Sequence, residues 1–247
     1  MQRSFKTTQQ RVLEHYASVR HRQKAPDRNL RAALKRAFDR EIGPYLPQEK
    51  TVAILDAGCG EGRLLDYLCT CGYTDLDGFD ISPQNVDLCH GLGLRFVEQM
   101  DLLDLICKPV ERTYDLVFAF DVIEHLEKER AAAAVEALRL RLKPGGVLLV
   151  RMPNMGHLLA NFYRHGDLTH EFGVTENSVV DLLIAAGFAA DWIEVRAVWE
   201  GHRLLGRLRE SYLAALHSLV ALADGRGRPR IVTKNLLAIG RAPTERP

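Results

Sequence analysis

The sequence lacks the features that mark membrane-spanning and secreted chains. No run approaches the ~18 consecutive apolar residues of a membrane span, and residues 1–6 lack the apolar core of a signal peptide. The five cysteines include no C-x-x-C pair, and their odd number favours reduced thiols over a disulfide framework. These absences predict a cytoplasmic protein, with peripheral contact to a membrane left open.

The net charge of the chain is small, and aromatic residues are few. The formal net charge is +1 and aromatic residues make up 7% of the chain, so no global field attracts nucleic acid or an anionic membrane. The aromatic–basic interleaving that binds single strands is absent as well. We therefore expect no nucleic-acid partner. With 247 residues, of which 47% are hydrophobic, the chain can bury one large core.

A glycine-rich turn follows the first predicted strand. The apolar run Val52–Leu55 predicts a buried strand, and the segment after it reads Asp56-Ala57-Gly58-Cys59-Gly60-Glu61-Gly62 before a helical pattern begins at Arg63. Glycines without a Cβ allow a tight turn and a close approach of backbone to a ligand. The first N–H groups of the following helix are unpaired at the same place. The segment predicts a nucleotide-binding corner, although an ordinary glycine-rich turn is the alternative for the loop alone.

The spacing of the glycines indicates which nucleotide is bound. A dinucleotide fingerprint, G-x-G-x-x-G, would need glycine where Arg63 stands, and no Gly-Lys-Ser/Thr follows for a phosphate loop. Asp56 would repel a pyrophosphate but could accept a hydrogen bond from an amine. The pattern D-x-G-x-G-x-G resembles motif I of class I S-adenosylmethionine-dependent methyltransferases. This resemblance implies S-adenosylmethionine as cofactor, S-adenosylhomocysteine as product, and four cofactor-binding residues: Asp56, Gly58, Cys59 and Gly60.

Three later segments continue the resemblance at the required intervals. Leu76–Ser82 is a second strand ending in Asp80, an acid placed to accept bonds from ribose hydroxyls, and Ser82-Pro83 predicts a helix start. A third strand, Leu94–Val97, precedes Met100-Asp101-Leu102, residues that flank the adenine in the family. The fourth predicted strand is Tyr114–Phe120. The resemblance assigns five more residues to the cofactor: Asp80, Ile81, Asp101, Leu102 and Asp121.

The order of elements predicts the fold class. Strands and helices alternate from residue 50 to 152, ending with the strand Val147–Val150, which predicts a parallel sheet with right-handed crossovers. A helix over Val174–Ala186 ends at Gly187, and two strands follow near Ala190–Val198 and Ile231–Gly240. The resemblance implies an α/β, Rossmann-like sheet of seven strands, mostly parallel with the last antiparallel, and helices on both faces.

The predicted methyltransferase domain spans residues 51–247, preceded by a helical segment over residues 1–50. Within that segment, Arg28–Ile42 is amphipathic with a strongly basic polar face. In the family such a segment lies over the cofactor; a solvated helix on the rim of the fold is the alternative.

Asp121-Val122-Ile123-Glu124-His125 follows the fourth strand, at the sheet edge where ligands bind in open α/β folds. His125 is a candidate base, oriented by Glu124. The acid-x-x-Glu-His pattern also resembles a motif of quinone O-methyltransferases that touches a metal, and its ligand types suit a divalent ion. A role in shaping the substrate site is the third reading. We expect no metal, because methyl transfer from a sulfonium needs no Lewis acid, and we expect activity to survive a chelator.

The stretch from Pro153 to Gly173 has no regular periodicity and is long for an internal connection, which indicates function. His170 is the first choice for the catalytic base, with Asp167 to orient its ring, although both residues could serve only to hold the loop together. The segment from Tyr163 to Glu171 resembles small methyltransferases of bacterial polysaccharide and lipopolysaccharide biosynthesis. The density of polar side chains suits a hydroxylated substrate, with three expected contacts: Asn154, Tyr163 and Arg164.

Residues 201–229 form a predicted helical insert, with Leu204, Leu205, Leu208, Tyr212, Leu216 and Leu219 on one face. Packing of this face on the same molecule is the expected role. Closure over substrate, dimerisation and contact with a membrane are the alternatives.

These observations predict an enzyme that moves a methyl group from S-adenosylmethionine to an oxygen, expected to be a sugar hydroxyl of a glycan or nucleotide-sugar. A quinone or small-phenol O-methyltransferase and a non-catalytic cofactor-binding fold are the alternatives. The sequence decides neither the acceptor, nor O- against N-methylation, nor the oligomeric state.

Overall fold

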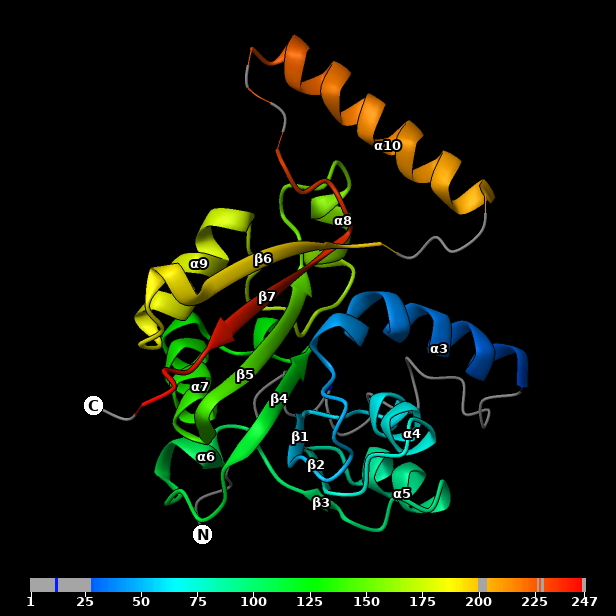
Figure 1. Ribbon diagram of the computed structural model, residues 1–247. Helices are drawn as coiled ribbons and strands as arrows, with labels where there is room; N and C mark the ends of the chain where they lie inside the picture. Colours follow the sequence, from blue (N-terminus) through cyan, green and yellow to red (C-terminus); the bar gives the residue numbers. More distant parts are fainter. Residues whose placement is uncertain (1–11, 13–27, 200–203, 226, 228, 246–247) are drawn as a thin grey trace, which may run out of the picture.

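The computed structural model describes residues 12, 28–199, 204–225, 227 and 229–245. Residues 1–11 and 13–27 of the predicted N-terminal segment and 201–203, 226 and 228 of the predicted insert lie outside this description. The chain forms an α/β fold around a seven-stranded sheet (Figure 1). The strand order is β3-β2-β1-β4-β5-β7-β6. The predicted fold class is confirmed.

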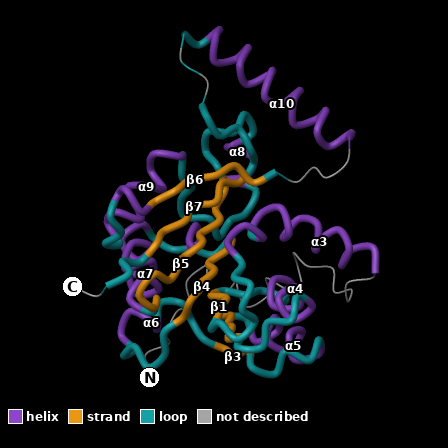
Figure 2. Tube along the Cα trace, in the orientation of Figure 1, coloured by secondary structure: helices purple, strands orange, loops and turns teal. Residues whose placement is uncertain are grey.

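Five of the strands are parallel, and they build the half of the molecule that carries the glycine-rich turn. They are β1 (Ile54–Ala57), β2 (Leu76–Asp80), β3 (Val97–Gln99), β4 (Tyr114–Phe120) and β5 (Leu142–Pro153). The strand β7 (Asn235–Arg241) runs antiparallel to β5 and to β6 (Ile193–Val198), and the sheet twists along its length (Figure 2). Central strands buried on both faces explain the apolar residues Ile54 and Leu55 of β1 and the apolar run Leu116–Phe120 of β4.

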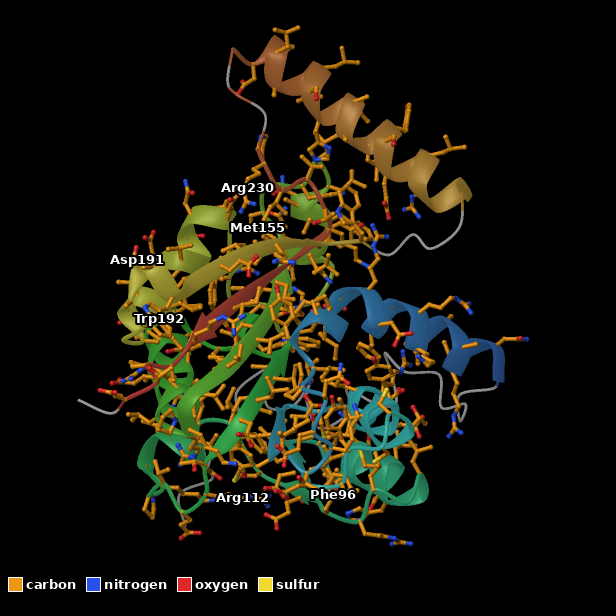
Figure 3. The ribbon with its side chains drawn as sticks, in the orientation of Figure 1. Phe96, Arg112, Met155, Asp191, Trp192 and Arg230 are labelled. Carbon is orange, nitrogen blue, oxygen red and sulfur yellow. The ribbon has the colours of Figure 1, made fainter. Side chains whose placement is uncertain are left out.

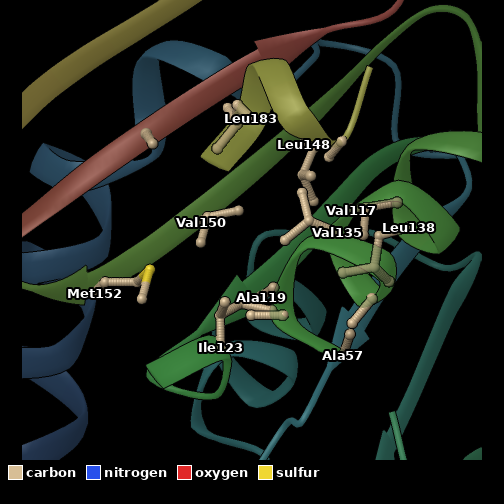
Figure 4. Packing of buried hydrophobic residues seen from close by; sticks show 14 of the residues in the cluster. Ala57, Val117, Ala119, Ile123, Val135, Leu138, Leu148, Val150, Met152 and Leu183 are labelled. Carbon is tan, nitrogen blue, oxygen red and sulfur yellow. The ribbon is translucent and has the colours of Figure 1, made fainter. Parts of the chain in front are cut away.

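Helices cover both faces of the sheet. One face packs against α6 (Asp104–Cys107), α7 (Lys128–Leu140) and α9 (Glu176–Ala185). Figure 4 shows Val135 and Leu138 of α7 meeting Val117, Leu148 and other strand residues in this layer. The opposite face packs against α3 (Arg28–Glu41), α4 (Arg63–Thr70) and α5 (Pro83–Gly91). Each face therefore has its own core, and the carboxyl edge of the sheet stays open between them.

Several helix boundaries follow the sequence signals. The Ser82 side chain accepts the backbone N–H of Asn85 and Pro83 is the first helical residue of α5. Thr175 and Ser178 form a reciprocal capping box at the start of α9, and Gly187, with φ 88°, follows its end. Short 3₁₀ turns at Gly43–Tyr45, Ile123–His125 and Ala190–Trp192 and the six-residue α8 (Ala160–His165) complete the described elements before α10 (Leu204–Ala223).

Several predicted strand boundaries are corrected. The first strand begins at Ile54, not Val52, and the fifth begins at Leu142, not Val147. The third strand begins at Val97, not Leu94, because Leu94 is buried in a turn in which Val97 donates its N–H to the Leu94 carbonyl. The sixth begins at Ile193, after the 3₁₀ turn Ala190–Trp192. The seventh begins at Asn235, because the Ile231 and Thr233 carbonyls accept hydrogen bonds from a buried asparagine side chain instead of pairing in the sheet.

The helix α10 does not pack as predicted. Its opposite side contacts the body: His217 is buried, accepts the Leu158 N–H at Nε2, and donates from Nδ1 to the Leu213 carbonyl. The predicted apolar face instead points to solvent, with Leu208, Tyr212 and Leu219 between 57% and 67% exposed. Leu204 and Leu205 have side chains outside the description. The helix stands apart from the sheet in Figure 1. No helix among the described residues is both long and apolar enough to span a bilayer.

Candidate active site

A cavity of about 1060 Å³ opens at the carboxyl ends of β1, β2 and β4. The strand order reverses between β1 and β4, and ligands of open α/β sheets bind at such a switch point. Arg112 and Phe96, just before β4 and β3, lie at the opposite edge of the sheet (Figure 3). All nine residues predicted to hold the cofactor line the cavity: Asp56, Gly58, Cys59, Gly60, Asp80, Ile81, Asp101, Leu102 and Asp121.

The glycine-rich turn has the left-handed backbone that its sequence predicts. Gly58 and Gly60 have φ of 73° and 54°, conformations that L side chains rarely adopt. The N–H groups of Gly58 and Cys59 both donate to the Phe79 carbonyl at 2.9 Å, which ties the turn to β2. A Cβ at Gly60 would meet no atom within 4 Å, whereas one at Gly58 would strike Val122 at 2.7 Å. Gly60 thus borders open space where a ligand can approach the backbone.

Asp80 organises the adjoining turn. Its Oδ2 accepts the Gly60 N–H at 2.9 Å, and its Oδ1 accepts the Ser82 N–H at 2.9 Å and the Asn85 side-chain amide at 3.0 Å. These bonds orient the carboxylate at the end of β2, and each oxygen has two lone-pair directions. Asp80 therefore fixes the glycine-rich turn and keeps an acceptor at the cavity wall.

Asp56 is a buried acid at the end of β1. It is 2% exposed, and burial together with the charge of Asp80 raises its pKa to about 7. An ammonium or sulfonium group beside it would favour the ionised carboxylate. The site therefore suits a cationic ligand and disfavours a pyrophosphate.

An ion-pair network joins α3 to the rim of the cavity. Arg151 of β5 donates from Nη1 to both carboxylate oxygens of Glu41 at 3.2 Å, and its guanidinium also pairs with Asp121 and lies 4.5 Å from the Phe120 ring centroid. Asp121 has φ 54°, the one non-glycine residue with positive φ in the described chain, and such strain clusters at functional sites. The last turns of α3 border the cavity through Leu34, Phe38 and Glu41.

A histidine pair and a buried acid lie at the other end of the cavity. His125 lines the wall and its ring centroid is 4.7 Å from that of His170. Burial, reinforced by the neighbouring histidine, lowers the pKa of His125 to about 4, and burial also lowers the pKa of His170. Glu124 is 1% exposed, and burial raises its pKa well above the usual value. Both imidazoles are therefore neutral at pH 7.

The connection after β5 brings His170 to this cluster, whereas Asp167, predicted to orient its ring, bonds within the loop. The Glu171 N–H donates to the Glu124 carbonyl at 2.8 Å, which places His170 beside His125. Asp167 accepts the N–H and hydroxyl of Thr169 at 2.9 and 2.6 Å. Its partners hold the loop, and His170 itself does not border the cavity.

The three expected substrate contacts lie outside the lining of the cavity. The Asn154 amide donates to the Ile231 and Thr233 carbonyls at 3.0 and 2.8 Å. Arg164 donates to the carbonyls of His170 and Glu171, and the Tyr163 carbonyl accepts His170 Nδ1–H at 3.0 Å. These partners position the loop that carries His170.

Several residues of the wall were not predicted from the sequence. Glu41 and Arg151 pair across 110 positions, so no local pattern shows their meeting. A charged residue in the apolar strand β5 was the available signal for Arg151. The lining residues not predicted from the sequence include Phe120, Glu127, Arg130, Glu171, Trp199 and Lys234.

The comparisons with known proteins identify the family. Residues 19–191, more than half of the chain, match the family described as "Methyltransferase domain". The chain belongs to this methyltransferase family. It is 32% identical over 99 residues to a tRNA (carboxymethyluridine(34)-5-O)-methyltransferase of Arabidopsis thaliana, covering 39% of this chain and 23% of that protein. The chain spans less than half the length of the curated relatives that it matches.

Solved structures share the fold of this methyltransferase. An S-adenosylmethionine-dependent methyltransferase of Archaeoglobus fulgidus superposes with a TM-score of 0.64 at 21% identity, covering 85% of this chain and 94% of that chain. The N-methyltransferase NodS of Bradyrhizobium japonicum WM9, in complex with S-adenosylhomocysteine, gives 0.53 at 18% identity, covering 95% and 96%. The methyltransferase uses S-adenosylmethionine as its cofactor.

The residues of the cavity fit this cofactor. When bound, S-adenosylmethionine supplies an electrophilic methyl group on a sulfonium. The open space at Gly60 admits a ligand against the backbone, Asp80 offers acceptors to hydroxyl groups, and Asp56 offers a carboxylate to a cation. The remaining work of the protein is to align the acceptor and exclude water.

Proposed function

We propose that the methyltransferase methylates a hydroxyl oxygen of a sugar, in a glycan or a nucleotide-sugar. The observation that carries this proposal is His125 in the cavity wall, with Glu124 and His170 grouped beside it. A hydroxyl keeps its proton at neutral pH, so its methylation needs a group that takes up the proton or lowers the hydroxyl pKa. A neutral amine already has a lone pair and needs neither.

The wall beside His125 supports a hydroxylated acceptor. The lining of the cavity includes four charged residues: Glu127 at the start of α7, Arg130 in its first turn, Glu171 and Lys234. Carboxylates accept hydrogen bonds from hydroxyl groups, and the two cations suit the diphosphate of a nucleotide-sugar. The volume of about 1060 Å³ exceeds the ~300–1,000 Å³ of common ligand pockets, which leaves space for cofactor and acceptor together.

A small phenol or quinol is the second candidate acceptor. Phe120 and Trp199 line the same cavity and offer stacking surface, and the Asp121–His125 pattern resembles quinone O-methyltransferases. The helix α3 belongs to the proposal in either case: we place it over the cofactor, since Arg151 holds Glu41 at the cavity rim. A fold that binds cofactor without turnover is the third possibility the assay tests.

The experiment is methyl transfer from cofactor labelled in its methyl group to a panel of nucleotide-sugars, soluble and lipid-linked glycans, quinols, phenols, amines and tRNA. Mass spectrometry and NMR of the product locate the new methyl. We expect it on a sugar oxygen, with transfer lost in Asp80→Ala. Label on a nitrogen, a phenol oxygen or tRNA, or no transfer while S-adenosylhomocysteine binds normally, would contradict the proposed acceptor.

A further inference from the structure

We propose that Glu124, His125 and His170 hold one divalent transition-metal ion, such as Zn²⁺, Mn²⁺ or Co²⁺, at the acceptor end of the cavity. The role of the ion in methyl transfer rests on the proposed function, whereas its binding does not. This proposal replaces the expectation from the sequence that no metal takes part.

The ligand atoms are already close together. One carboxylate oxygen of Glu124 and one ring nitrogen each of His125 and His170 lie within 4.8 Å of one another, the one such group found among the described residues. Metal–ligand bonds of about 2.0–2.2 Å place neighbouring ligand atoms roughly 3–4 Å apart, so small side-chain rotations complete the site. Two imidazoles and one carboxylate suit first-row transition metals better than Mg²⁺ or Ca²⁺.

One polar atom of Glu124 lacks a partner among the described residues. Its Oε2 is buried and has no hydrogen-bond partner within the described structure, although the residue is 1% exposed. A buried, unpartnered carboxylate oxygen costs free energy and calls for a ligand. A cation among the three groups supplies the missing partner.

Hydrogen bonds orient both rings for binding through Nε2. The Tyr163 carbonyl can only accept, so His170 donates to it from Nδ1 at 3.0 Å. Thr169 gives its hydroxyl proton to Asp167 at 2.6 Å and accepts from His125 Nδ1 at 2.8 Å. Each ring therefore carries its proton on Nδ1 and its lone pair on Nε2. Metal-binding histidines are oriented by such outer contacts to carbonyl or carboxylate groups.

The three proposed ligands differ from the run Asp121–His125, whose ligand types the sequence already showed to suit a divalent ion. Asp121 pairs with Arg151, so its charge is already matched, and His170 from the connection after β5 takes its place. Arg164 donates to the backbone carbonyls of His170 and Glu171, and the Glu171 N–H donates to the Glu124 carbonyl. The loop residues predicted to bind substrate thus support the third ligand.

Of the three ligands, His125 borders the cavity, and an acceptor would reach the ion from that side. An acceptor hydroxyl bound there has a lowered pKa and releases its proton to solvent. Its oxygen then forms the new bond to the methyl carbon while the carbon–sulfur bond breaks and the electron pair returns to sulfur. One cation, one carboxylate and two neutral imidazoles carry a net charge of +1, which stabilises the alkoxide. His170 then acts as a ligand and not as the base.

The test measures metal binding without an acceptor. The full chain is stripped with a chelator and dialysed, then titrated with Co²⁺ or Zn²⁺ alone by calorimetry and by the visible absorption of bound Co²⁺. We expect about one equivalent to bind and the melting temperature to rise with metal. Glu124→Gln and His170→Ala should each weaken binding at least tenfold, whereas His165→Ala, on exposed α8, should leave it unchanged. Circular dichroism checks that each variant is folded.

Absence of saturable binding to the wild type, or equal binding by folded Glu124→Gln and His170→Ala, would overturn the proposal. Activity gives the second measurement: chelation should reduce methyl transfer to whichever acceptor the panel identifies, and added Zn²⁺ or Mn²⁺ should restore it. A methyl found on a nitrogen or a phenol would contradict the sugar acceptor while leaving the metal site in place. The two failures are therefore distinguishable.

Discussion

Two buried carboxylates at the switch point of the sheet have different tasks. Asp80 accepts three hydrogen bonds and so shapes the backbone of the glycine-rich turn. Asp56 lies behind it at the end of β1 with a raised pKa of about 7. Hydrogen bonds from the protein fix the Asp80 carboxylate, whereas the protonation of Asp56 responds to the charge of a bound ligand.

The raised pKa of Asp56 predicts a dependence of stability on pH. Between pH 3.8 and about 7 the folded protein holds a proton on Asp56 that the unfolded chain has released. The free energy of unfolding therefore falls as pH rises through this window. Asp56→Asn removes the titration, so the wild type should lose stability relative to this variant from pH 4 to 7.5, as measured by urea unfolding.

The control for this measurement is Asp87→Asn, which changes an exposed acid on α5. Its difference from the wild type should show no such trend. A difference between wild type and Asp56→Asn that stays constant across the window would contradict the raised pKa.

At the scale of single residues, the sequence predicts the place of a side chain where that place depends on a local pattern. The acids that end β1 and β2 and the turn glycines all border the cavity, because their positions depend on the strand–turn–helix unit in which they stand. Asn154 also follows a strand, yet its amide bonds carbonyls 77 and 79 positions away. Whether such a polar side chain faces a ligand or holds a loop depends on long-range contacts, which spacing alone does not reveal.

At the scale of elements, α3 is attached to the sheet by one buried ion pair. Glu41 is 8% exposed in its side chain and pairs with Arg151, while Phe38 and Ile42 pack in the core of that face. Farther along the helix, Lys35 and Asp39 form an exposed pair four residues apart. The last turn of α3 is therefore the part that holds the helix at the cavity.

Glu41→Gln should loosen this attachment. Loss of one charge leaves Arg151 paired with Asp121 alone, and a charge-assisted hydrogen bond contributes roughly 1.5–3 kcal/mol. We expect hydrogen exchange at the Ile42 amide, which donates to the Phe38 carbonyl, to become about tenfold faster or more. Lys35→Gln, at an exposed pair of little energetic consequence, should leave it unchanged. Equal exchange in both variants would show that the ion pair does not hold α3.

Elements with strong local signals were predictable and those fixed by tertiary contacts were not. β4 matches its predicted bounds because an apolar run between polar flanks reads as a buried strand. The three-residue β3 was misplaced because burial of Leu94 in the preceding turn imitates a strand pattern. The leucine face of α10 was expected to pack inward, but His217 and its bond to Leu158 turn the opposite side toward the body.

At the scale of the molecule, the sheet order places every element of the proposed chemistry at one edge. The parallel strands bring the glycine-rich turn, Asp80 and Asp121 to their carboxyl ends, and the antiparallel pairing of β7 with β5 brings Lys234 and Asn235 to the same cavity. The fold was predictable as a whole because alternating strands and helices permit few topologies. The acceptor was not predictable, because the cavity wall that would contact it is built from segments that are far apart in the sequence.

The most direct test of the account is calorimetric titration of the chain with S-adenosylhomocysteine. The wild type should bind at a single site. Asp80→Ala should weaken binding by roughly 1.5–3 kcal/mol, about 10- to 150-fold in Kd. Gly60→Val, which places a branched side chain in the open space beside the turn, should remove measurable binding while circular dichroism shows a folded protein. No binding by the wild type, or unchanged affinity in both folded variants, would contradict the assignment of this cavity to the cofactor.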